Sequence, residues 1–222
     1  MYKRQVGSSL LAGLGSWAAA LGYGELMGEV QEADAASLAW AERRGFAVVA
    51  RHPRLVLDLA GVEPPAVAPP VGIEIVTWAE RPELAPGMYA VAREAYADVP
   101  DGEETVMPPF EEWLSMDLQG AGDRPEGTFV ALAGDEVVGY AKFHFSSTRP
   151  DVARHDMTGV LRAWRRRGIA GALKRAEIAW AKEQGYARLV TGNEERNEPI
   201  RKLNAQYGYV PEPGTVTVRG PI

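Results

Sequence analysis

The spacing of hydrophobic residues alternates along the chain between a helical and a strand-like period. Residues 168–184 place apolar side chains on one face at helical spacing, which predicts a long helix ending at Gly185. Residues 128–133 and 136–145 alternate around a Gly-Asp pair, which predicts a β-hairpin. The remaining helices are predicted at 6–22, 33–43, 83–97, 110–118 and 198–206, and the remaining strands at 23–30, 46–59, 73–78, 151–161, 187–191 and 209–218. These elements predict an α/β (α+β) fold, with a mixed and mostly antiparallel sheet flanked by helices.

The start of the chain repeats its end. Shifted by 163 positions, residues 6–59 (the N-terminal repeat) align without a gap on residues 169–222 (the C-terminal repeat). Because internal repeats mark duplicated units, we predict that residues 1–60 are the C-terminal half of a truncated domain and that 73–222 form a complete one. The identical pairs include Leu10 and Leu173, Trp17 and Trp180, Ala18 and Ala181, Gly22 and Gly185, Tyr23 and Tyr186, Leu26 and Leu189, and Gly45 and Gly208.

A proline-rich stretch separates the two parts. Residues 61–72 read GVEPPAVAPPVG, which predicts a semi-rigid extended linker. The half-domain before this linker lacks the strands that would pair its sheet and cover its apolar helix. We therefore expect an aggregation-prone surface on it.

Composition and charge narrow the classes of function. A net charge of −6 and a pI of about 5.2 disfavour general binding to nucleic acid or to an anionic membrane. The chain has no cysteine, which excludes disulfides, thiolate metal sites and a cysteine nucleophile, and is compatible with a cytoplasmic location. Its three histidines, His52, His144 and His155, are too scattered to predict a metal site.

The first twenty residues resemble a secretory signal, with Lys3 and Arg4 followed by an apolar run. The repeat argues against this interpretation, because the aligned stretch 173–185 carries charges between its apolar positions, as an amphipathic helix does. The run is also shorter than the roughly 20 residues that cross a bilayer. The opening MYKRQ matches the translation of a transposon-end adapter used in sequencing libraries, which favours a non-native origin for residues 1–5 over a natural short N-terminus.

The junction between the strand 151–161 and the helix 168–184 carries the clearest chemical signal. It reads VLRAWRRRGIAG from Val160 to Gly171, so a glycine opens a helix shortly after a strand. The free N–H groups of a first helical turn attract anions. Arg165, Arg166 and Arg167 would add charge-assisted hydrogen bonds. The alternative interpretation is a solvated basic helix start.

The pattern R-x-x-G-x-A of Arg165, Gly168 and Ala170 resembles the acetyl-CoA pyrophosphate loop of the GNAT acyltransferase superfamily. The downstream Thr191, Asn193, Asn197, Asn204, Gly208 and Tyr209 resemble the strand, helix and turn that follow it in tandem members. The resemblance covers 73–222 and, as half of a second copy, 6–59. It implies acetyl-CoA as co-substrate, with the pantetheine arm between the strands 151–161 and 187–191. The implied cofactor-binding residues are Val160, Arg165, Arg166, Arg167, Gly168, Ile169, Ala170, Gly171, Asn197 and Asn204.

The chain departs from this family at one catalytic position. Many GNAT members carry a tyrosine four residues before the terminal glycine, where it protonates the leaving thiolate, but here that residue is Asn204. An amide does not supply a proton at neutral pH, and Tyr207 falls on a different part of the helix. We predict that Asn204 orients the thioester or the cofactor and that the thiolate leaves without a dedicated acid. In the N-terminal repeat, Asp34 and Ala41 replace the two asparagines, so we expect no cofactor there.

Several residues are candidates for the general base. His155 and Asp156 lie on the strand 151–161, and Asp98, Asp101, Glu103 and Glu104 lie in the acidic loop 98–109. The alternatives are a structural histidine and a solvated loop. The resemblance implies that a neutral amine of a small molecule or peptide attacks acetyl-CoA directly in a ternary complex. Acyl-CoA binding without turnover, and a purely structural role, remain as alternatives.

Overall fold

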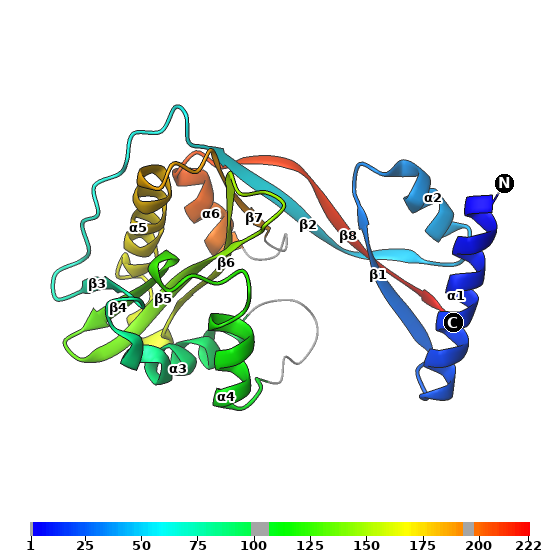
Figure 1. The fold of residues 1–222 in the computed structure, drawn as a ribbon, viewed down its shortest axis with the longest axis horizontal. Coiled ribbons are helices and arrows are strands. Elements are labelled where there is room, and N and C mark those ends of the chain that lie inside the picture. The colour runs from blue at the N-terminus through cyan, green and yellow to red at the C-terminus, as the bar shows by residue number, and fades with distance from the viewer. Residues whose placement is uncertain (1, 99–106, 193–197) are drawn as a thin grey trace. The chain divides into compact units, whose positions relative to one another are not determined.

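The computed structural model describes residues 2–98, 107–192 and 198–222. Five residues with predicted roles therefore lie outside the described part of the chain: Asp101, Glu103, Glu104, Asn193 and Asn197. The chain divides into two compact units (Figure 1). Unit 1 includes Met1–Arg54 and Pro211–Ile222, and unit 2 includes Leu55–Gly192 and Arg196–Val210. Among the described helices, none combines the length and the apolar character needed to cross a bilayer.

Unit 2 is built on a mixed sheet with the strand order β2-β7-β6-β5-β4-β3. Neighbours from β3 to β6 pair antiparallel, while β6 and β7 pair parallel. The strands are β3 Glu74–Thr77, β4 Thr128–Ala133, β5 Glu136–Phe145, β6 Val152–Val160, β7 Arg188–Gly192 and the end of β2 Ala47–Asp58. The helices are η1 Pro82–Leu84, α3 Ala85–Tyr96, α4 Phe110–Trp113, the π-helical η2 Leu114–Leu118, η3 Pro125–Gly127, η4 Arg162–Trp164, α5 Ile169–Glu183 and α6 Glu198–Gln206.

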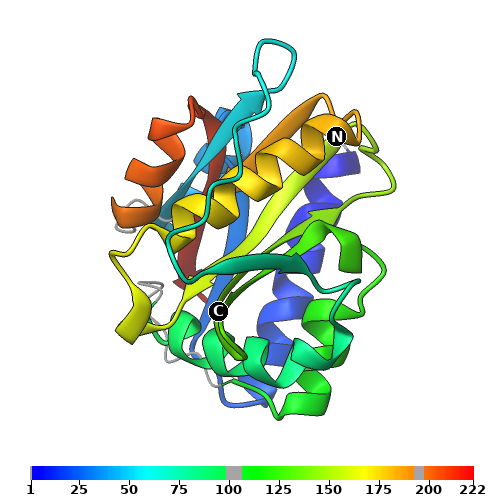
Figure 2. The ribbon, with the colours of Figure 1, turned by 90° about the vertical axis from the view of Figure 1, so that its left-hand side faces the viewer.

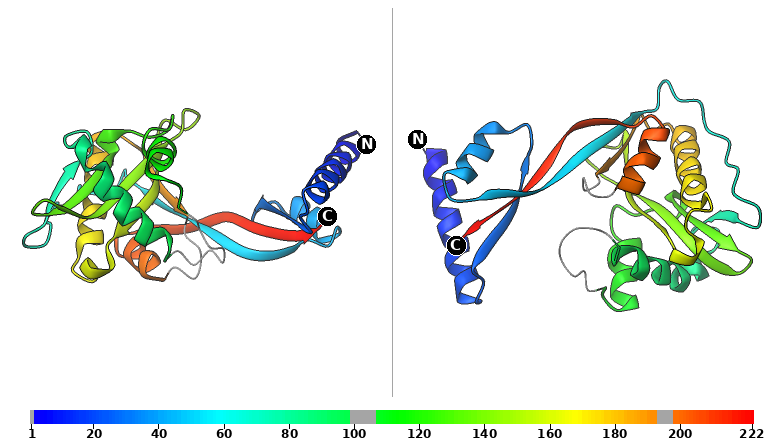
Figure 3. Two further views of the ribbon diagram at one scale, coloured as in Figure 1. Left: turned by 90° about the horizontal axis from the view of Figure 1, so that it is seen from below. Right: turned by 180° about the vertical axis from the view of Figure 1, so that it is seen from behind.

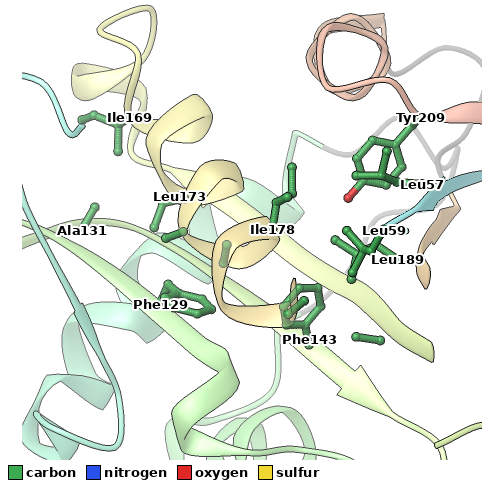
Figure 4. Close-up of a cluster of buried hydrophobic side chains, with 14 of the residues drawn as sticks. Leu57, Leu59, Phe129, Ala131, Phe143, Ile169, Leu173, Ile178, Leu189 and Tyr209 are labelled. Atoms are coloured by element: carbon green, nitrogen blue, oxygen red, sulfur yellow. The ribbon is translucent and has the colours of Figure 1, made fainter. Parts of the chain in front are cut away.

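Helices cover both faces of this sheet (Figures 1 and 2). On one face, Ile169 and Leu173 of α5 join Phe129 and Phe143 of the strands in one buried cluster (Figure 4). On the other face, α3 and α4 contribute a second buried cluster with strand residues. The predicted fold class, a mostly antiparallel sheet flanked by helices, is thereby confirmed.

The predicted linker packs along α5. Arg175 of α5 donates a hydrogen bond to the carbonyl of Ala68 at 2.7 Å, and Lys182 donates to the carbonyl of Leu59. Val62 packs against the same buried cluster as α5. Residues 61–72 lie within unit 2.

Unit 1 contains α1 Tyr2–Ala20, β1 Glu25–Gln31, α2 Ala35–Glu42, most of β2, and nearly all of β8 Val210–Pro221. β8 pairs antiparallel with β1 and lies between β1 and β2 in the sheet order (Figure 3). Val216 and Val218 of β8 form a small buried cluster with Ala41. The prediction that the N-terminal half-domain finds no pairing strand is wrong on this side of β1. The last strand of the C-terminal repeat pairs there, and hydrophobic periodicity does not reveal a partner so distant in sequence.

Candidate functional site

The loop between β6 and α5 has a backbone geometry that leaves the start of α5 uncovered. η4 carries the chain away from the end of β6, and Arg166 and Gly168 then adopt positive φ angles of 61° and 84°. Gly168 is the N-cap of α5 and provides no side-chain hydrogen bond to the helix. Its left-handed conformation favours glycine, which avoids the strain a Cβ would meet there.

The first turn of α5 is therefore suited to bind an anion. The helical hydrogen bonding begins when the N–H of Ala172 donates to the carbonyl of Gly168 at 3.0 Å. The N–H groups of Ile169, Ala170 and Gly171 precede that bond, and helix geometry leaves such groups without an intrahelical acceptor. They carry the positive end of the helix dipole. This donor set fits a pyrophosphate group.

The three arginines of the loop do not all face this turn. Arg165 donates from Nε to the carbonyl of Val160 at 2.9 Å and pairs through Nη2 with Asp98 at 2.7 Å. Arg162 also binds Asp98, at 2.5 Å, and the two guanidinium groups lower the pKa of the Asp98 carboxyl to about 2. Arg167 lies over the ring of Trp164, 4.6 Å from its centroid. Arg165 and Arg167 thus fix the loop.

β6 and β7 separate towards the loop. Their parallel register joins Val152–Arg154 to Arg188–Val190, and β6 then continues as far as Val160. On the other edge of β6, pairing with β5 continues as far as Val160, opposite Gly139. The predicted pantetheine contact at Val160 therefore lies at the end of β6, five residues before Arg165.

Asp156 is the extra residue of a β-bulge in β6. Lys142 lies opposite Met157 and Phe143 opposite His155, so the register passes over Asp156. Bulges are frequent next to active sites, where they redirect a side chain. The Asp156 carboxylate lies 3.0 Å from Lys142 Nζ and keeps 32% of its side chain exposed, so solvent and a ligand can reach it.

Lys142 connects Asp156 to two further carboxylates. Its side chain is 2% exposed, and its ammonium lies 2.8 Å from Asp123 Oδ1 and 3.9 Å from Asp117 Oδ1. Burial acts to lower the pKa of Lys142, but Asp117 and Asp156 outweigh this effect and raise it above its ordinary value. Burial raises the pKa of Asp117, against the influence of Lys142. We call Lys142, Asp117, Asp123 and Asp156 the lysine–carboxylate cluster.

His155 points to the opposite face of β6, towards α5. Its Nδ1 lies 3.0 Å from Glu177 Oε1, and its Nε2 lies 2.5 Å from the hydroxyl of Tyr209. Lys174 Nζ is 3.5 Å from Glu177 Oε2. All four residues are buried, and burial lowers the pKa of both His155 and Lys174 and raises that of Tyr209. The structure therefore does not bring His155 and Asp156 together, and it places His155 away from solvent.

Asn204 and Tyr207 also occupy different surroundings. Asn204 is fully buried on α6. The Tyr207 hydroxyl donates to the carbonyl of Gly171 at 3.1 Å and lies 3.0 Å from Arg175 Nη1. Tyr207 therefore contacts the first turns of α5, whereas Asn204, three residues earlier, points into the interior.

Two groups of buried charged residues were not predicted from the sequence. Lys142 stands two residues after buried Tyr140, and residues two apart in a strand share a face, so the strand pattern could have predicted that Lys142 points inward. Lys174 and Glu177 likewise fall among the buried positions of α5. Buried charges of this kind need partners. Their partners come from other elements, which periodicity does not identify.

Comparisons with known proteins identify the family and agree with the fold. The profile of the Acetyltransferase (GNAT) family matches residues 86–209, and the chain belongs to that family. A GCN5-related N-acetyltransferase from Sphaerobacter thermophilus is similar in fold, with a TM-score of 0.70, 22% identity, and coverage of 89% of this chain and 59% of that one. A tandem GNAT protein from the clavulanic acid biosynthesis pathway has a TM-score of 0.73 and 21% identity, covering 100% of this chain and 71% of that one. The search among curated proteins found no match.

The GNAT family carries out acyl-CoA-dependent acetyl transfer in general, and the fold of this chain is that of a transferase. The chain spans only 59% of the Sphaerobacter structure. The activity and substrates of this chain are therefore matters for proposal.

Proposed function

We propose that this chain is an acetyl-CoA-dependent, cytoplasmic N-acetyltransferase that moves an acetyl group to the amine of a small molecule or peptide. The observation that carries the proposal is the start of α5, where Gly168 caps the helix in a left-handed conformation without a capping side chain. An anionic group can approach such a turn closely. The separation of β6 from β7 beyond Arg154 supports a place for the pantetheine arm.

The loop residues divide into two roles in this proposal. The backbone N–H groups of residues 166–171 would bind the pyrophosphate, and the backbone of Val160 would hydrogen-bond the pantetheine. Arg165 holds the Val160 carbonyl and Asp98, so it would fix the loop in place without touching the phosphate. Asn204 would orient the cofactor from the buried side of α6.

Asp156 is the base that the geometry favours for the acceptor amine. A neutral amine attacks the thioester carbonyl, the carbon–sulfur bond breaks, and the amine proton passes to a carboxylate directly or through water. Asp156 is reachable, whereas His155 is buried and paired with Glu177 and Tyr209. His155 would instead position β6 against α5.

The cofactor loop can be tested by substituting one glycine. Gly168→Ala places a Cβ at φ 84°, which opposes the conformation that opens the anion site. We expect acetyl-CoA affinity, measured by calorimetry, to fall at least tenfold. Gly134→Ala is the matched control, because Gly134 also has positive φ (62°) but lies in the turn between β4 and β5. Equal affinities for wild type and Gly168→Ala would contradict the proposed loop.

The base can be tested separately. We expect Asp156→Asn to lower kcat/KM for an amine acceptor by about 100-fold, within the usual range for general-base catalysis, while acetyl-CoA affinity stays unchanged. Asp135→Asn, in the exposed turn after β4, should leave both unchanged. Normal acetyl-CoA binding without transfer to any amine in a broad panel would favour the non-catalytic alternative.

A further inference from the structure

One side of α1 carries large apolar side chains that are exposed in the described structure. Leu10, Leu14 and Trp17 are 69%, 48% and 62% exposed, and Val6 and Leu21 extend the same stripe. Their spacing of three and four residues places them on a single face of the helix. Soluble proteins rarely leave such a continuous apolar stripe in water without a partner for it.

The C-terminal repeat shows what covers the equivalent face. Val6 and Leu10 correspond to Ile169 and Leu173 of α5, which are 1% and 0% exposed. These two residues pack in the cluster that includes Phe129 and Ala131 of β4 (Figure 4). In unit 2, therefore, an antiparallel sheet covers the face that is exposed on α1.

The edge of β1 points to the same partner independently. Among the described strands, β1 stands first in the sheet order and pairs with β8. Its equivalent, β7, lies between β2 and β6, and β6 adds to it in parallel at Arg188–Val190. The corresponding residues of β1 are Glu25–Met27. An uncovered strand edge of this kind presents N–H and C=O groups for a further strand.

We infer that the α1 stripe and the outer edge of β1 together form a docking surface for an antiparallel β-sheet. The occupant is the front half of a GNAT copy, equivalent to residues 73–168 of this chain. Its last strand adds in parallel to β1 beside Glu25–Met27, and its apolar face covers the stripe. A second α1 helix could cover the stripe but would leave the β1 edge open, whereas one sheet accounts for both.

The size of the related tandem protein supports this occupant. All of this chain is covered in that comparison, but only 71% of the tandem protein is. Unit 1 by itself has a small core, with Ala41, Val216 and Val218 as its buried cluster. A front half would enlarge that core as β4 and β5 do in unit 2.

Thiol labelling can test the surface, because the 222-residue chain has no cysteine. Leu10→Cys is compared in the 222-residue chain and in an extended chain with residues 73–168 repeated directly before Val6, the equivalent of Ile169. We expect labelling at position 10 to be at least tenfold slower in the extended chain. Ala20→Cys is the matched control, because Ala20 and its equivalent Glu183 are both exposed and should label at equal rates.

Two outcomes would overturn the inference. One is unchanged labelling of Leu10→Cys in an extended chain whose circular dichroism and cooperative unfolding show that it folds. The other is slow, concentration-dependent labelling already in the 222-residue chain, which would make a second copy the occupant.

A second measurement applies even if the extended chain does not fold. In the 222-residue chain, we expect amide hydrogens at Glu25–Met27 to exchange at least 100-fold faster than those at Arg188–Val190. Equal protection of the two segments would show that the β1 edge is already covered and would overturn the inference.

Discussion

The N-terminal and C-terminal repeats have the same local geometry in different surroundings. Gly22 and Gly185 end their helices with φ angles of 86° and 78°. The N–H of Tyr23 donates to Ala18 at 3.1 Å, and the N–H of Tyr186 donates to Ala181 at 3.0 Å. The helix α5 is buried against a sheet, whereas α1 exposes Leu10 and Trp17. Local sequence therefore sets the helix end, and partners elsewhere in the chain set the burial.

The repeats also differ in the chemistry of their interiors. Lys174, Glu177 and Tyr209 form a buried charged group with His155 in unit 2. The aligned residues of the N-terminal repeat are Leu11, Leu14 and Phe46. A buried ion pair contributes little net stability but is costly to break. The C-terminal repeat is thus the one whose interior depends on the charge state of its side chains.

The largest expected difference between the repeats lies at one leucine pair. Leu173→Ala should lower the free energy of unfolding by about 2–5 kcal/mol, because it leaves a cavity in a buried cluster. Leu10→Ala should change it by less than about 0.5 kcal/mol, because this side chain is 69% exposed. Urea unfolding of both variants measures the contrast. Similar losses would show that α1 is covered in solution.

An intermediate effect is expected from pH. Burial lowers the pKa of His155, so between its folded and unfolded pKa values the unfolded chain binds a proton that the folded chain does not. Its contribution to stability is therefore present above about pH 6.5 and falls as pH drops below that value, by at most about 1.4 kcal/mol per pH unit. We expect the urea midpoint of wild type to fall more steeply between pH 7 and 5 than that of His155→Gln. Parallel profiles would contradict this account.

The smallest expected difference between the repeats lies at the glycines that end their helices. Gly22→Ala and Gly185→Ala should each cost about 1–2 kcal/mol, because alanine is strained at positive φ. A Cβ at either position meets no atom within 4 Å, so the backbone alone sets the cost. Urea unfolding at neutral pH compares them. A difference larger than about 1 kcal/mol would show that the local geometry is not equivalent.

Much of the fold could be predicted from the sequence because most elements are specified locally. The predicted segments 128–133, 136–145 and 198–206 coincide with β4, β5 and α6. The predicted helix 110–118 is present as α4 followed by a π-helical turn. The predicted closing segment 209–218 is one strand, β8, which begins at Val210 and continues to Pro221. Its pairing with β1 depends on two segments almost the whole chain apart, which no local pattern describes.

The site was predictable where it consists of backbone and less so where it consists of side chains. The glycine pattern located the N-terminus of α5, because positive φ at Gly168 is a local requirement. The partners of Arg165 and Lys142 lie on other elements of unit 2. The hydrophobic periodicity around Asp98 and Asp123 does not indicate those contacts. The cofactor-binding and catalytic roles themselves stay predictions.

The place of β8 in the sheet of unit 1 also sets the order in which the molecule can assemble. Residues 1–54 leave the ribosome before unit 2, yet β8, which lies between β1 and β2, is completed only when Pro221 has been synthesised. Most of unit 2 is complete by then. Such long-range strand pairing is slow compared with local folding. Unit 1 is therefore begun before unit 2 but can be completed only after it. Loss of the last dozen residues would remove β8, the strand between β1 and β2.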